Sequence, residues 1–134
     1  MSNYFSDKQV NLLAEAKSSK KYIHLKNENK SLKDIMNLKN LNKMISMHNC
    51  WNQSNFSLVL DKNIIPFPKF STDGNSFGFT KTSPDPIKVA NYIKKGASLV
   101  LNDLIYLSRE IQFLADDLQT ITNGKCQANL YFSM

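Results

Sequence analysis

The sequence has little arginine, and this shortage affects which partners its positive charge could bind. Arg109 is the one arginine, so the net charge of +6 comes from lysine. Proteins that read nucleic acids favour arginine, whose planar fork matches phosphates and guanine edges with paired hydrogen bonds. The lysines here are scattered through asparagine-rich stretches. The composition therefore argues against a nucleic-acid partner, and a small basic nucleic-acid binder is the last of three hypotheses.

Cysteine and histidine are also scarce. Cys50 and Cys126 are separated by most of the chain, and only His48 lies near either of them. Two candidate ligands cannot close a zinc site, which needs four. We therefore expect no metal site, and we interpret the cysteines as two buried free thiols in a reducing compartment.

Several other signals are missing from the sequence. No apolar run approaches the length of a membrane span, and Met1–Tyr4 is not the basic start of a signal peptide. There is no glycine-rich phosphate loop and no Ser/His/Asp arrangement, and Asp116 and Asp117 point apart on a predicted helix. The prediction is a cytoplasmic protein without a membrane partner.

The chain of 134 residues, 42% of them hydrophobic, is long enough for one domain and too short for two. We predict a single domain over residues 1–134. Helical spacing and caps predict helices over 7–16, 86–95 and 108–118, and either one bent helix or two short ones over 31–45. Strands are expected at 21–25, 55–60 and 97–101, an extended path at Pro66 and Pro68, and a loop over 71–81.

Residues 125–133 alternate with period two. Apolar Cys126, Ala128, Leu130 and Phe132 point one way, and polar Gln127, Asn129, Tyr131 and Ser133 point the other. Two interpretations fit a strand of this kind. It could line a β-barrel whose interior is a polar pocket, or it could be an ordinary half-exposed strand with its polar side in water.

The order of motifs over residues 86–133 resembles a known family. The segment Gly96-Ala97-Ser98-Leu99-Val100-Leu101-Asn102, the helix that Ser108 caps, and the strand Ala128-Asn129-Leu130-Tyr131-Phe132-Ser133 are similar to a stretch of the cupin-like, JmjC-related oxygenases, in the branch that includes ribosomal-protein hydroxylases. The resemblance extends more weakly to residues 51–70.

The resemblance implies a fold, cofactors and a site. The fold class would be α+β, with N-terminal helices and short strands leading into an incomplete antiparallel cupin-type (double-stranded β-helix) barrel, whose own strand lies near 125–134. The full-length family uses iron(II) and 2-oxoglutarate, with iron held by a His-x-Asp pair and a later histidine. By the match, Asn129, Tyr131 and Ser133 would be cofactor-binding residues that line the cosubstrate pocket.

The sequence departs from this family at the metal. Met134 comes before a His-x-Asp pair could occur, and His24 and His48 match no part of the triad. We therefore expect a fragment of a protein hydroxylase that is truncated before the iron motif, has no catalytic or metal-binding residue of its own, binds no cofactor tightly and is inactive alone. The alternative is a non-catalytic protein-interaction module derived from the cupin fold. Either interpretation implies a protein substrate or partner, and a half-barrel could form a homodimer.

Overall fold

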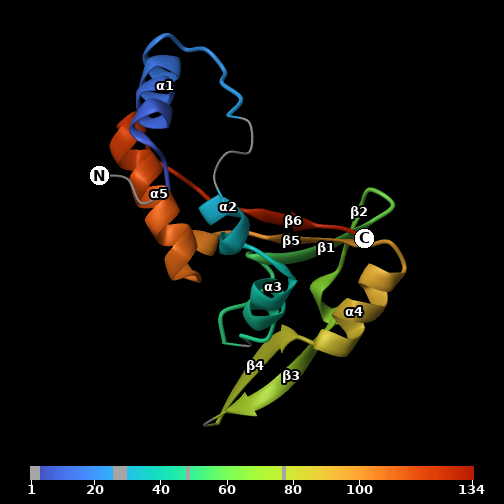
Figure 1. The fold of residues 1–134 in the computed structure, drawn as a ribbon. Helices are drawn as coiled ribbons and strands as arrows, with labels where there is room; N and C mark the ends of the chain where they lie inside the picture. Colours follow the sequence, from blue (N-terminus) through green and yellow to red (C-terminus); the bar gives the residue numbers. More distant parts are fainter. Residues whose placement is uncertain (1–3, 26–29, 48, 77) are drawn as a thin grey trace.

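The computed structural model describes residues 4–25, 30–47, 49–76 and 78–134. It is a mixture of helices and antiparallel sheet (Figure 1). The helices are α1 (Asp7–Ser18), α2 (Lys30–Ile35), α3 (Leu38–Ile45), α4 (Pro86–Lys94) and α5 (Arg109–Thr122). The strands are β1 (Phe56–Leu60), β2 (Asn63–Ile65), β3 (Ser71–Ser76), β4 (Phe79–Pro84), β5 (Ser98–Leu101) and β6 (Leu130–Phe132), and 3-10 turns cover Phe67–Lys69 and Leu104–Tyr106.

The main sheet has four antiparallel strands in the order β2-β1-β5-β6. Its central pair places Phe56 opposite Leu101 and Leu58 opposite Leu99. The second sheet is the β3–β4 hairpin. Neither sheet closes on itself within the residues that the structure describes. The coarse prediction of helices combined with antiparallel sheet is confirmed, and the cupin-type barrel stays a prediction.

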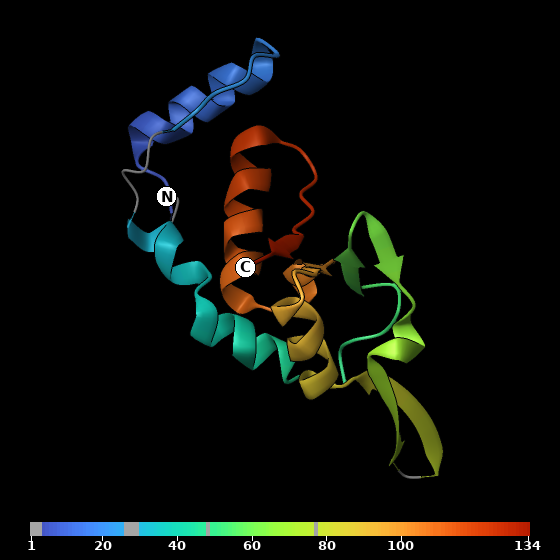
Figure 2. The ribbon, with the colours of Figure 1, turned by 90° about the vertical axis from the view of Figure 1, so that its right-hand side faces the viewer.

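One face of the main sheet is covered and the other is not. In two views at right angles, α3, α4 and the β3–β4 hairpin all lie on the same side of the sheet (Figures 1 and 2). The covered face carries Phe56, Leu58, Leu99 and Leu101, each nearly inaccessible to water. They join Trp51, Phe70 and residues of α3, α4 and α5 in one hydrophobic core.

Three helices begin where their capping residues predict, but α1 and α5 run beyond the predicted ends at 16 and 118, to Ser18 and Thr122. Ser6 caps α1 in a capping box with Gln9, Asp85 caps α4 by accepting from the backbone of Ile87 and Lys88, and Ser108 caps α5. Gly96 has a φ of 93°, the left-handed conformation expected just beyond the end of α4. Residues 31–45 form two helices, because Asn37 caps α3 separately from α2. α2 begins at Lys30, so Ser31 lies inside the helix and is not its N-cap.

Long-range packing decides which side of a helix is buried. In α1 the most buried residue is Gln9, and Ala14 is exposed. In α4 Val89 enters the core, whereas Ile87 is exposed. Because α1 packs against α5 and α4 packs against β1, these neighbours fix the buried side of each helix.

Three predicted segments differ in the structure. Residues 21–25 are irregular and Tyr22 is 99% exposed, because no neighbouring strand pairs with them in the described chain. Residues 71–76 and 79–84 form the β3–β4 hairpin and not a loop, with Gly74 inside a strand opposite Lys81. Pro66 is extended, but Pro68 lies in the 3-10 turn Phe67–Lys69.

Across the described ranges, none of the helices has both the length and the apolar character needed to cross a membrane.

Candidate functional site

Of the residues that the resemblance places in a pocket, Tyr131 lies in the edge strand β6, and Asn129 and Ser133 flank its two ends. The predicted alternation is confirmed through 126–133, where odd-numbered residues are exposed and even-numbered residues are partly buried. Leu130 and Phe132 pack against the core. Asn129, Tyr131 and Ser133 therefore share the uncovered side, where Tyr131 is 73% exposed.

The register of the sheet shows what surrounds these residues. Ser57, Val100 and Tyr131 form one row across β1, β5 and β6, and Ile64, Val59 and Ser98 form the next. Side chains in facing positions of antiparallel strands project to the same side. These six residues make up the surface that we call the open face, which is uncharged and part apolar: Ser57, Val59, Ile64, Ser98, Val100 and Tyr131.

Asn129 lies two residues before Tyr131 along the chain, where it contacts a turn. Its Oδ1 accepts a hydrogen bond from the backbone N–H of Asp103 at 3.4 Å, and the carbonyl of Ala128 accepts from the N–H of Leu104 at 3.0 Å. Asp103 is left-handed, with a φ of 60°. Oδ1 is thus engaged as an acceptor, and Nδ2 is the atom of Asn129 that could donate to a ligand.

Asn129, Tyr131 and Ser133 together form what we call the strip. Its side chains are neutral hydrogen-bond donors. Residues two apart on a strand repeat at roughly 6.6 Å, so Asn129, Tyr131 and Ser133 offer an amide and two hydroxyls at regular intervals. Such groups can bind a carboxylate, and none of them supplies a general base near neutral pH.

The described residues do not fit a metal. No group of three or more His, Cys, Asp or Glu side chains is close enough together within those ranges to hold an ion. His24 lies in the irregular exposed segment, and His48 falls outside the described residues. A facial triad needs three ligands, and the described side chains bring no such set together.

The cysteines are free, as the spacing predicts, but they are not buried. Cys50 and Cys126 are both partly exposed. Cys126 is the first residue of the alternating stretch at the rim of the core, and Cys50 lies in the turn that precedes Trp51.

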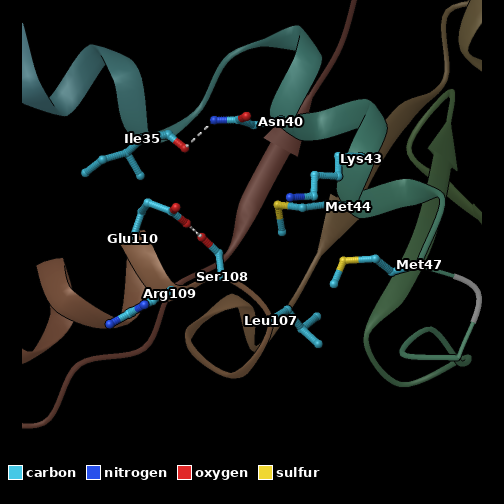
Figure 3. A pocket seen from close by; sticks show the side chains of 9 residues that line it. All are labelled: Ile35, Asn40, Lys43, Met44, Met47, Leu107, Ser108, Arg109 and Glu110. Carbon is cyan, nitrogen blue, oxygen red and sulfur yellow. Dashed lines mark hydrogen bonds between the residues drawn. The ribbon is translucent and has the colours of Figure 1, made fainter.

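A groove that the sequence did not predict lies between α3 and the start of α5 (Figure 3). Its volume is about 230 Å³. Lys43 and Met44 reach it from α3, and Ser108 and Glu110 line the opposite side. Its apolar lining is Ile35, Met44, Met47 and Leu107.

The carboxylate of this groove is already stabilised within the chain. The pKa of Glu110 is lowered, first by its own backbone N–H, then by the Ser108 hydroxyl, which donates to it at 2.9 Å, and also by Lys43 and Arg109. Asn40 donates to the carbonyls of Asp34 and Ile35. The groove is thus a hollow whose polar atoms serve local structure, and it brings no catalytic set together.

One signal for the groove was present in the sequence, since Ser108 is a cap and Glu110 follows in the first turn. The approach of Lys43 was not visible, because it depends on how α3 packs against α5. Comparison with known proteins adds no relative: the chain matches no family model, no curated protein and no solved structure.

Proposed function

We propose that these 134 residues are the front part of a cupin-type, JmjC-related iron(II)/2-oxoglutarate oxygenase that hydroxylates a protein. In this proposal Asn129, Tyr131 and Ser133 contribute neutral donors to the cosubstrate pocket. The iron ligands and the rest of the barrel would come from sequence beyond these residues, and the chain by itself would be inactive.

One observation carries the proposal: the three matched polar residues share the uncovered side of an edge strand, while their apolar neighbours face the core. A barrel that binds a polar cosubstrate needs this arrangement, with the apolar side of the strand packed outward and the donors facing inward. The Asn129 contact with Asp103 supports it further, because it fixes the side chain at the rim of the open face.

The first experiment is to read the gene past codon 134 and to weigh the native protein. The proposal expects a longer product with a His-x-Asp pair and a later histidine. A native product of 134 residues, or a longer one without those ligands, would remove the oxygenase proposal.

The second experiment tests the pocket in that longer protein. Tyr131→Phe and Asn129→Leu should each raise the KM for 2-oxoglutarate, by about tenfold or more if a hydrogen bond to a charged group is lost. Tyr106→Phe is the matched control, since it deletes the same hydroxyl from an exposed tyrosine outside the strip. An unchanged KM in both pocket variants would contradict the assignment of these residues.

A non-catalytic interaction module is the second candidate, and the open face favours it. Ile64 and Tyr131 are large side chains left 72% and 73% exposed on one surface, which is typical of a binding face. The two candidates differ in the gene test, because a module needs no iron ligands downstream.

A further inference from the structure

The outer edge of β6 lacks the features that normally protect an edge strand. In the part of the chain that the structure describes, β6 pairs with β5 on one side and with no other strand. From Cys126 to Met134 there is no charged side chain and no proline. Natural sheets use lysine, proline or a bulge at an edge strand to prevent pairing with another chain. β6 contains neither lysine nor proline.

The opposite edge of the same sheet is protected. Lys62 precedes β2 in a tight turn, Pro66 follows its last residue, and Lys69 comes one turn later. The two edges therefore differ, although β2 and β6 each contain three residues. Only the β6 edge is suited to receive another strand.

The pattern of β6 matches itself when the strand is turned end to end. If two copies pair antiparallel about Tyr131, Leu130 lies opposite Phe132 of the second copy, and Asn129 lies opposite its Ser133. Partners in an antiparallel pair project to the same side. Apolar residues therefore meet apolar residues next to the two cores, and polar residues meet polar residues on the open face.

The distribution of charge also favours this surface as the contact with a second copy. Two chains of net charge +6 repel each other, and the repulsion is weakest where the approaching surfaces carry no charge. The open face and the nine residues that end at Met134 have no charged side chain. A second copy can approach there without placing lysines against one another.

We propose that the chain forms a two-fold dimer in which β6 pairs antiparallel with β6 of a second copy, giving a continuous eight-stranded sheet with both helical layers on the same side. The open faces of the two copies then join across the Tyr131 pair. This inference does not rest on the oxygenase proposal, since it uses only the edge, the residue pattern and the charge of the present chain.

The test is the mass of the 134-residue chain in solution, measured by light scattering over a dilution series. Tyr131→Lys places two like charges directly opposite each other at the two-fold axis and should weaken the dimer by about tenfold or more. Ile64→Lys is the matched control: it adds the same charge at the same exposure on the same face, but on the protected edge, and should leave the dimer intact.

Charge complementation separates the interface from a folding defect. Tyr131→Glu alone should weaken the dimer to a similar extent, although it lowers the net charge, because it too sets like charges opposite each other. An equimolar mixture of Tyr131→Lys and Tyr131→Glu should recover a dimer that native mass spectrometry identifies as mixed, since opposite charges then face each other.

Three results would overturn the proposal. The wild-type chain could be monomeric throughout the dilution series, Ile64→Lys could disrupt the dimer as strongly as Tyr131→Lys, or the mixture of variants could stay monomeric although each variant keeps the circular dichroism and cooperative melting of the wild type.

Discussion

The indole Nε1 of Trp51 donates a hydrogen bond of 2.8 Å to the carbonyl oxygen of Met44. Met44 lies in the last turn of α3, where its carbonyl also accepts from the backbone N–H of Met47 at 3.0 Å, and Trp51 precedes β1. The ring of Trp51 also packs edge-on against Phe56, with centroids 5.5 Å apart. One side chain therefore joins the end of α3 to the first strand of the main sheet.

Trp51→Phe should lower the free energy of unfolding by about 1–3 kcal/mol, because it removes one of the hydrogen bonds to the Met44 carbonyl and leaves a gap where the indole was. The measurement is urea unfolding followed by circular dichroism, since the variant has no tryptophan to fluoresce. Tyr22→Phe, at a residue that is 99% exposed, should change the value by less than about 0.5 kcal/mol. Equal effects of the two substitutions would contradict the role given to Trp51.

Gly96→Ala should destabilise the protein by about 1–2 kcal/mol, because the φ of 93° at Gly96 is costly for any residue with a Cβ. The comparison is Gly74→Ala, where the added Cβ meets only the carbonyl of Lys81 at an ordinary 3.7 Å. Gly74→Ala should be neutral or slightly stabilising. A thermal melt of both variants checks this, and the prediction is wrong if Gly96→Ala melts with the wild type.

Lys62→Gly should stabilise the protein by about 0.5–1 kcal/mol. Asp61 and Lys62 form the two-residue turn between β1 and β2, and both have positive φ, at 50° and 65°. Such a turn favours glycine, which adopts positive φ without steric cost. The urea midpoint should rise, whereas a fall would mean that the Lys62 side chain contributes more than its backbone strain costs.

The Glu110 carboxyl should titrate below 4.5, its ordinary pKa, when followed by carbon-13 NMR. A carboxyl whose pKa is lower in the folded state adds stability above its unfolded pKa, and this stability is lost as the pH falls through the folded pKa. Ser108→Ala should raise the pKa of Glu110 toward 4.5, because it removes the hydroxyl that donates to the carboxylate. Thr120→Ala, at the far end of α5, should leave the titration of Glu110 where it was.

The second half of the fold was predictable because its signals are local. Asp85-Pro86 starts α4, Gly96 ends it, and Ser108 caps α5. Each of these boundaries is therefore specified by residues that lie within a few positions of it. The β3–β4 hairpin was missed for the opposite reason. Its two strands are mostly polar, since the hairpin does not rest on the core along its length, and Gly74 has the appearance of a loop residue.

The candidate site was predictable only in part. Alternation placed Asn129 and Tyr131 on one side of a strand, and the structure agrees. Whether that side is covered depends on which strands neighbour β6 and where α3 and α4 pack. These contacts join residues far apart in the chain, and no short stretch of sequence specifies them. The strand expected at 21–25 failed in the same way, because an alternating segment becomes a strand only when a partner is present.

The strand order has a consequence for folding during synthesis. β1 lies between β2, which follows it at once, and β5, which leaves the ribosome only after the whole hairpin and α4. Until β5 emerges, Phe56 and Leu58 have no central partner, and the β1–β2 hairpin is too small to be stable alone. The nascent chain therefore carries β1 without this partner while residues 61–101 are made, which is less than a third of the chain, and it is during this interval that a chaperone would bind it.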